Sequence, residues 1–194
     1  TQIVKVTNYF TMEVIGETID DAAGEAFDKV AKMLNLPYPG GPLLDKHAQK
    51  GNSERFKFPH PRVKELNFSF SGLKTSVLYF LRKELQTNDN FISENLDDIC
   101  ASVQKTIVDI LMINLKKAAQ QTGINQLAIA GGVSANSELR NRLNKLTEEG
   151  FKVFIPKFEY CTDNAGMIAI TGYFNYLEQN FASQHSVPNA RMKV

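Results

Sequence analysis

The apolar positions at the start of the chain predict a β-hairpin followed by a helix. Residues 1–7 carry β-branched apolar side chains, and a second β-rich run over residues 10–15 follows the turn-prone Asn8. From about residue 20 to residue 34, apolar side chains recur every three or four positions, which is the spacing of one helix face. Residues 18–21, Thr-Ile-Asp-Asp, resemble a capping box at the start of this helix.

The middle of the chain has the pattern of a helical region. Pro and Gly residues over 37–42 end the first helix with a rigid loop, and a short helix is expected over residues 43–49. Residues 51–68 are polar, basic and interrupted by proline, which predicts a surface excursion. Two further helices are expected over residues 72–85 and about 94–121. The second has an apolar stripe of Leu96, Ile99, Val103, Ile107, Ile110, Leu111, Leu115 and Ala118.

The last third of the chain predicts strands that alternate with helices. Residues 127–130, Leu-Ala-Ile-Ala, contain no polar side chain, as expected of a strand that is covered on both faces. This strand leads into a Gly131-Gly132 turn and then into a helix. A further strand over residues 153–155 and a final helix over about 163–180 complete the chain. The order of elements indicates the α/β class.

Composition narrows the class of protein. The 194 residues suit one domain with a helical insert, and a chain of this length buries roughly two-thirds of its unfolded surface. The 22 basic and 21 acidic residues give a formal charge of +1, so no strong overall field favours nucleic acid or anionic membranes. Two cysteines, no apolar run near the roughly 20 residues of a membrane span, and no signal-peptide pattern predict a soluble, reduced, cytoplasmic protein.

Several features carry candidate chemistry, and each also has an ordinary structural explanation. The Gly131-Gly132 turn lets a ligand approach the backbone where helix N–H groups face an anion, but such pairs also serve tight packing. The loop over residues 38–42 is equally well explained as a rigid connector. Charged side chains that share one face of the first helix are typical of a solvated surface. They are Asp21, Glu25, Asp28 and Lys32.

Asp163 has two alternative roles, a metal ligand or a helix cap, and the residues alone favour the cap. A carboxylate that follows a strand of an open sheet faces the ligand crevice, although Asp163 and Asn164 at a helix start are also common helix caps. The three histidines lack the i, i+4 spacing of a helical zinc pair, so the chain alone completes no metal site. Cys161 fits the role of a small buried hydrophobe better than that of a ligand.

Five sequence blocks, in this order, resemble one family along almost the whole chain. They are GETIDDAAGEAFDK (16–29), YPGGP (38–42), FSFSGLKT (68–75), AGGVSAN (130–136) and CTDNAGMIA (161–169). The family is the bacterial type of tRNA N6-adenosine threonylcarbamoyltransferase, long described as an O-sialoglycoprotein endopeptidase or glycoprotease. The resemblance implies an actin, Hsp70 and sugar-kinase-like (RNase-H-like) fold. In it, residues 1–194 form a C-terminal nucleotide-binding lobe with a helical insert at about 42–122.

The resemblance also implies roles for individual residues. The set implied to bind the nucleotide is Asp28, Gly41, Asp45, Gly131, Gly132 and Asn136. Asp28 and Gly41 are implied to lie at the ribose region, and Asp45, one helical turn further, is a candidate to share that role at a position where bacterial relatives vary. Asn136 after the glycine turn is implied to contact the adenylate. Asp163 is implied to complete a site for one iron or zinc ion. The resemblance assigns no general base.

Parts of the family pattern are not found in this chain. In the family, an earlier lobe carries a His-x-x-x-His pair that supplies the other metal ligands. A strand with a Ser-Gly-Gly-His phosphate loop then leads into the position of Thr1. The resemblance therefore implies a C-terminal fragment that is inactive by itself. Its sheet is expected to lack a central strand between the strand at 1–7 and the strand at 127–130.

The implied reaction is transfer of the threonylcarbamoyl group from threonylcarbamoyl-AMP to N6 of adenosine 37 in tRNAs that read ANN codons. The implied partners are tRNA, the adenylate and accessory proteins of that pathway, with no membrane. A non-catalytic nucleotide-binding or ATPase scaffold of the same superfamily is the main alternative, and ATP hydrolysis without tRNA modification would distinguish it. The third alternative, a metal-dependent glycoprotein endopeptidase, lacks support from an H-E-x-x-H motif.

Overall fold

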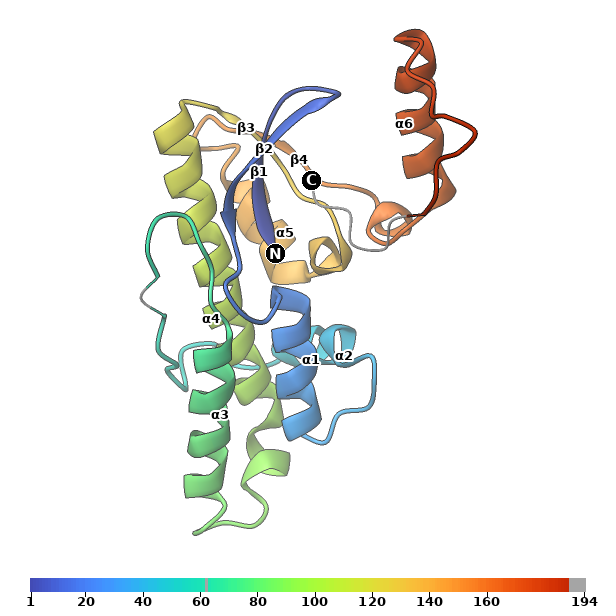
Figure 1. Ribbon diagram of the computed structural model, residues 1–194. Coiled ribbons are helices and arrows are strands. Elements are labelled where there is room, and N and C mark those ends of the chain that lie inside the picture. The colour runs from blue at the N-terminus through green and yellow to red at the C-terminus, as the bar shows by residue number, and fades with distance from the viewer. Residues whose placement is uncertain (62, 189–194) are drawn as a thin grey trace.

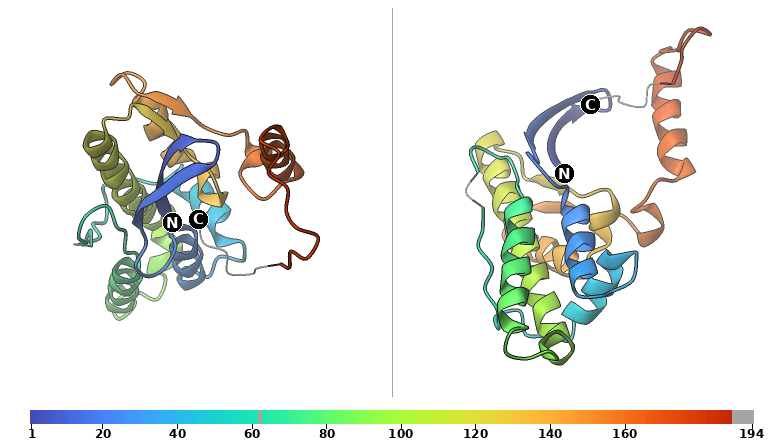
Figure 2. Two further views of the ribbon diagram at one scale, coloured as in Figure 1. Left: turned by 45° about the horizontal axis from the view of Figure 1, so that its top comes forward. Right: turned by 60° about the horizontal axis from the view of Figure 1, so that its bottom comes forward.

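The structure is a computed structural model that describes residues 1–61 and 63–188 of the chain (Figure 1). Its elements follow the predicted order of a hairpin, a group of helices, and then strands alternating with helices. The mixed α/β class is therefore confirmed. The hairpin lies over one end of the helical group, and the last helix stands apart from that group (Figure 2).

The hairpin at the start of the chain is confirmed. Strand β1 (Gln2–Asn8) pairs antiparallel with strand β2 (Thr11–Glu17), so β2 extends two residues beyond the predicted end. In the turn, the amide of Phe10 donates to Oδ1 of Asn8 at 2.8 Å, which is the side-chain bond that suits Asn to turns.

Four helices form the body of the molecule. They are α1 (Ala23–Met33), α2 (Gly40–Ala48), α3 (Ser71–Glu84) and α4 (Phe91–Thr122). All four were predicted, and their ends differ from the prediction by one to three residues. The apolar stripe of α4 packs at the centre, where Ile99, Val103 and Ile107 are fully buried. Gly123 ends α4 with φ of 69°, as expected of a glycine that closes a helix in the left-handed conformation.

The capping box predicted at residues 18–21 is wrong. The hydroxyl of Thr18 donates to the carbonyl oxygen of Asp21 at 2.7 Å, and α1 does not begin until Ala23. The amide of Ala23 donates instead to the Thr1 hydroxyl at 2.8 Å. One free N–H group of the first turn of α1 is therefore satisfied by the residue just before β1, a long-range contact that a local pattern does not contain.

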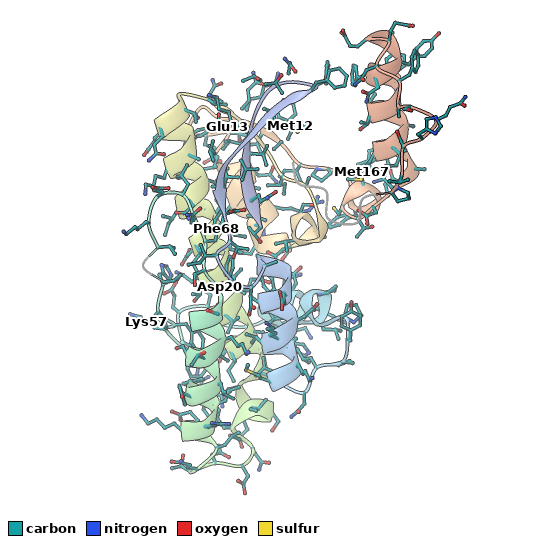
Figure 3. All side chains as sticks on the ribbon, in the orientation of Figure 1. Met12, Glu13, Asp20, Lys57, Phe68 and Met167 are labelled. Atoms are coloured by element: carbon teal, nitrogen blue, oxygen red, sulfur yellow. The ribbon has the colours of Figure 1, made fainter. Side chains whose placement is uncertain are left out.

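Asp20 caps α3 rather than α1 (Figure 3). Its Oδ1 accepts from the amide of Phe70 at 2.7 Å, and its Oδ2 accepts from the hydroxyls of Ser69 at 2.5 Å and Ser71 at 2.8 Å. Burial raises the pKa of the Asp20 carboxyl, but these hydrogen bonds outweigh burial, and the pKa lies below its usual value. One carboxylate thus joins the first and third sequence blocks.

The segment over residues 51–68 is not a simple surface excursion. Polar side chains such as Glu54 and Lys57 are exposed, but Phe58, Leu66 and Phe68 are buried, with exposures of 8%, 4% and 2%. Phe58 packs edge-on against Phe80 of α3 at a centroid distance of 5.6 Å. The segment therefore contributes to the core through its aromatic residues. The sequence suggested a surface loop because these aromatic residues are spaced among prolines and basic residues.

A second unit follows α4. Strands β3 (Gln126–Ala128) and β4 (Lys152–Phe154) pair in parallel, with the short 3₁₀ helix η1 (Gly132–Ala135) and helix α5 (Ser137–Lys145) between them. Their apolar side chains form a smaller core with the later part of α4. The prediction that β3 is covered on both faces is wrong. Leu127 is buried, but Ala128 is exposed, because no described element covers that face.

The described residues form two separate two-stranded sheets, β1 with β2 and β3 with β4. A groove of about 410 Å³ lies between them and is lined by residues of β1 on one side and of β3 and the following turn on the other. Apolar side chains of α4, including Leu111, Met112 and Leu115, also line it. β1 and β3 therefore each present a free strand edge to this groove.

The last elements among the described residues are the 3₁₀ turn η2 (Phe158–Tyr160) and helix α6 (Ala165–Leu177). The final helix is confirmed, but none of its residues is buried although it contains no charged side chain. Figure 3 labels Met167 on α6, which stands away from the helical body. The ring of Phe174 stacks on Tyr9 of the hairpin turn at 3.6 Å. No helix among the described residues has both the length and the apolar character needed to cross a membrane.

Candidate functional site

Asp28 connects α1 to the start of α2. Its Oδ1 accepts from the amides of Gly40 and Gly41, each at 2.9 Å, which satisfies two of the free N–H groups of α2. Neither bond uses Oδ2. A Cβ at Gly40 would overlap the Cβ of Ala31, whereas a Cβ at Gly41 would lie 3.9 Å from its nearest neighbours. Close packing therefore requires glycine at position 40, while position 41 has free space beside the Asp28 carboxylate.

Asp45 connects α2 to the start of α5. Its Oδ1 accepts from the hydroxyl of Ser137 at 2.6 Å, and its Oδ2 accepts from the amide of the same residue at 3.2 Å. Both carboxylate oxygens therefore have partners within the chain. This carboxylate at the N-terminus of α5 is also favoured by the helix dipole.

Asn136 is the N-cap of α5 and is 8% exposed. Its Oδ1 accepts from the amide of Leu139 at 3.0 Å, and its Nδ2 donates to Oε1 of Gln104 at 2.8 Å. Gln104 lies on α4 and is itself 4% exposed. The two bonds determine the orientation of the amide, because oxygen must face the helix and nitrogen must face Gln104.

The glycine turn lies beside these helix starts and lines one end of the groove. Gly131 has φ of 82°, a conformation that favours glycine, and a Cβ at Gly131 or Gly132 would meet no atom within 4 Å. The methyl group of Val133 is 3.4 Å from the position of a Cβ on Gly24, so η1 packs against α1. The backbone of the turn is therefore accessible on a support formed by α1 and α5.

The structure thus links the predicted residues in a chain of contacts: Asp28 holds the start of α2, Asp45 in the later part of α2 holds the start of α5, and Asn136 caps α5 directly after the glycine turn. Of the six predicted nucleotide-binding residues, only Gly131 and Gly132 line the groove. Sequence reasoning missed three residues that hold this arrangement, Gly40, Gln104 and Ser137. Only Gln104 had a recognisable signal, because it is a polar residue beside the apolar stripe of α4. Gly40 and Ser137 act through contacts between elements that no local pattern contains.

Asp163 lies on the exposed segment between η2 and α6, and the adjacent Asn164 caps α6 by accepting from the amide of Met167 at 3.1 Å. Within residues 1–61 and 63–188, no group of three or more His, Cys, Asp or Glu side chains is placed to hold a metal ion. Asp163 alone does not fit an iron or zinc ion, which requires three or four protein ligands.

Comparison with known proteins decides the family. A sequence profile described as tRNA N6-adenosine threonylcarbamoyltransferase matches residues 1–170. The chain belongs to the tRNA N6-adenosine threonylcarbamoyltransferase family. The resemblance that the five sequence blocks carry is thereby confirmed, and the matched residues include all five blocks.

Relatives described as tRNA N6-adenosine threonylcarbamoyltransferase share much of this sequence. The protein of Christiangramia forsetii is 61% identical over 194 residues, that of Cytophaga hutchinsonii 55% over 195, and that of Riemerella anatipestifer 52% over 195. Each match covers 100% of this chain and 57% of the relative. The chain therefore spans little more than half the length of these relatives.

One solved structure supports the fold. The crystal structure of HypF from T. kodakarensis superposes with a TM-score of 0.54, at 20% sequence identity, over 84% of this chain and 21% of that chain. At this identity the likeness concerns the fold alone. It agrees with the mixed α/β class.

Proposed function

We propose that this chain is the adenylate-binding part of an enzyme that transfers the threonylcarbamoyl group from threonylcarbamoyl-AMP to N6 of adenosine 37 in tRNAs that read ANN codons. The observation that carries the proposal is the chain of contacts in which Asp28 holds the start of α2 and Asp45 of α2 holds the start of α5, directly after an accessible glycine turn, in a chain of this family. Accessory proteins of the same pathway are the expected partners of the longer protein.

The proposed site binds the adenylate with backbone groups and a few oriented side chains. The space beside Gly41 admits the ribose, where Oδ2 of Asp28 accepts a hydrogen bond from a ribose hydroxyl. The backbone at Gly131 and Gly132 approaches the adenylate closely because neither residue has a side chain. Asn136 and Asp45 act next to these groups at the start of α5. Holding the adenylate in one orientation lowers the entropic barrier to attack by the tRNA amine.

The fold proposal is that residues 1–194 form one lobe of an actin, Hsp70 and sugar-kinase-like architecture, with a helical insert at about 42–122. A further strand, from a segment outside this chain, fills the groove between β1 and β3 and joins the two sheets into one. The free edges of β1 and β3 and the apolar lining from α4 support this proposal.

The metal proposal yields a prediction for this chain by itself. Because Asp163 is the only candidate ligand, the 194-residue chain is expected to retain far less than one iron or zinc ion per molecule after dialysis. Elemental analysis by mass spectrometry would measure it, with the Asp163→Asn variant as the baseline. A stoichiometric ion that is lost in the variant would contradict the prediction.

The function is tested on a longer protein that contains this chain, together with its accessory proteins, threonylcarbamoyl-AMP and an unmodified tRNA. Mass spectrometry of the digested tRNA measures the modified adenosine. We expect Asp28→Asn to raise KM for the adenylate about tenfold, since it removes one charged hydrogen bond to the ribose. Glu25→Gln is the matched control, because Glu25 lies on the same helix and pairs only with Lys29 at the surface.

The outcomes separate the proposed function from its alternatives. Modified adenosine in the tRNA supports the transferase. ATP hydrolysis with no modified adenosine indicates a nucleotide-binding scaffold or ATPase, and cleavage of a glycoprotein substrate indicates the endopeptidase. Either of the last two results, without tRNA modification, would overturn the proposal.

A further inference from the structure

Arg140 of α5 joins two segments that carry candidate site residues. Its Nε donates to the carbonyl oxygen of Ser134 at 2.7 Å. Its Nη2 donates to the carbonyl oxygen of Pro156 at 2.7 Å and to Sγ of Cys161 at 3.2 Å. The ring of Phe158 covers the guanidinium, with its centroid 4.0 Å from Cζ.

These contacts tie the glycine turn to the segment that leads to Asp163. Ser134 lies two residues before Asn136, and Cys161 lies two residues before Asp163. Among the described residues, every hydrogen bond between segment 156–163 and the chain that precedes it comes from Arg140. The attachment of this segment therefore depends on one side chain.

The chemistry of the contacts requires arginine. The carbonyl oxygens of Ser134 and Pro156 and the sulfur of Cys161 accept hydrogen bonds from two nitrogens of the planar guanidinium. The ring of Phe158 stacks on the face of the same group. The ammonium group of a lysine is a compact point charge and does not reach Ser134 and Pro156 together in this way. The thiol of Cys161 donates in turn to the carbonyl oxygen of Lys157 at 3.5 Å, which keeps the segment folded on itself.

We propose that Arg140 is a positioning residue that holds residues 156–163 against the turn at residues 131–136. Asp163 and Asn136 then keep a constant relative position while the substrate is bound. Arg140 acts through these segments and does not itself touch the reacting atoms. The importance of Asp163 and Asn136 rests on the proposed function, whereas the attachment itself is a property of this chain.

The attachment is tested by the rate at which Cys161 reacts with iodoacetamide in the folded chain, with the site of labelling identified by mass spectrometry. Cys161 is 2% exposed, so it reacts only when the segment opens. We expect Arg140→Lys to accelerate labelling of Cys161 about tenfold, since it removes hydrogen bonds from a charged donor. Cys100 is the internal reference, because it is fully buried in the main core and burial raises the pKa of its thiol to about 12.

Two further variants keep the test decisive. Arg142→Lys is the matched control on the same helix, because Arg142 pairs with Glu138 and Asp109 and not with segment 156–163. The Arg142→Lys variant should leave the rate of Cys161 labelling unchanged. Phe158→Ala removes only the exposed ring over the guanidinium, and should accelerate labelling by about twofold to fivefold. Fast labelling of Cys161 in the unaltered chain, or an equal rate in Arg140→Lys and Arg142→Lys, would overturn the proposal. Labelling of Cys100 at the rate of Cys161 in Phe158→Ala would also overturn it, because the effect would then be global.

The consequence for catalysis is measured on the longer protein. Arg140→Lys is expected to lower kcat about tenfold while KM for threonylcarbamoyl-AMP changes less than about threefold, because the substrate still binds but the two segments are misaligned. A general loss of folded protein would lower the active fraction without the selective labelling of Cys161. If the unaltered protein does not modify tRNA, the proposed function fails, and the labelling experiment still decides the attachment.

Discussion

At the scale of single residues, the contacts of the candidate site serve two purposes. Oδ1 of Asp28 satisfies the start of α2, and Oδ2 is not used in those bonds. The same division applies to the adjacent glycines, since Gly40 has no room for a side chain and Gly41 has room for one. A glycine that close packing requires and a glycine that packing leaves free to carry a side chain can therefore be told apart even where they are neighbours in sequence.

The two glycines give a direct test of this distinction. We expect Gly40→Ala to lower the free energy of unfolding by about 1–3 kcal/mol, because its methyl group overlaps Ala31. Gly41→Ala should change it by less than about 1 kcal/mol, because the nearest atoms are 3.9 Å from the new Cβ. Urea unfolding of both variants would measure the difference. Equal destabilisation would show that the space beside Gly41 is not available.

Asp20 makes stability depend on pH in the acid range. Its pKa is lowered in the folded chain, so its charged form contributes stability above the unfolded pKa of about 3.9, and this is lost as the pH falls through the folded value. Asp20→Asn is therefore expected to be less stable than the parent at pH 7, with a difference that shrinks below about pH 3. Urea midpoints at both pH values measure it. An unchanged difference would mean that the charge of Asp20 is not what stabilises α3.

At the scale of elements, much of the fold follows from the sequence. The hairpin and the helices were predicted because their apolar residues repeat with the period of a strand or helix. The local cap of α6 at Asn164 was also predicted, but the long-range contacts at the starts of other helices could not be predicted in this way. Thr1 accepts from the start of α1, Asp20 from the start of α3, and Asp45 from the start of α5. Asp20 lies 50 positions before its partner Phe70, and Asp45 lies 92 positions before its partner Ser137. Such contacts exist only after the chain has folded.

In the candidate site too, the sequence identified residues but not the contacts between distant elements. The family resemblance supplied Asp28, Gly41 and Asn136 as candidates, but not the bond from Asn136 to Gln104, because the two residues come close only when α5 packs on α4. The fully covered β3 strand was a wrong prediction for a related reason. Its apolar sequence indicates a partner that the described residues do not supply.

The two asparagine caps allow a matched comparison between elements. Asn136 caps α5, which packs in the smaller core, and Asn164 caps α6, which has no buried residue. Asn136→Ala should cost about 2–3 kcal/mol, because it removes a cap and leaves Gln104 without its buried partner. Asn164→Ala should cost less than about 0.5 kcal/mol of global stability, since α6 frays alone. Urea unfolding followed by circular dichroism tests this, and similar costs would mean that α6 is part of the cooperative unit.

At the scale of the whole molecule, three features leave strand edges or apolar surface uncovered among the described residues. β1 and β3 leave a groove between their edges, the apolar β3 strand is exposed on one face, and α6 carries exposed apolar residues. The largest exposures on α6 are those of Ile168 at 77% and Tyr176 at 61%. Apolar surface of this kind is normally covered. The chain spans 57% of its relatives, and we propose that segments of a longer protein cover these surfaces.

The last prediction concerns the strand that would fill the groove. In an antiparallel edge strand, alternate N–H groups face away from the partner, so about half of the β1 amides lack a strand partner on the groove side. A strand between β1 and β3 would bond these groups. We therefore expect the β1 amides that face the groove, and those of β3, to exchange at least tenfold more slowly in a longer protein than in this chain. The buried centre of α4, around Val103 and Ile107, should exchange equally in both and is the internal reference.

Equal protection of β1 and β3 in a monomeric 194-residue chain and in the longer protein would show that the groove is not completed by a strand. Protection that rises with the concentration of the short chain would instead indicate that a second copy supplies the missing pairing.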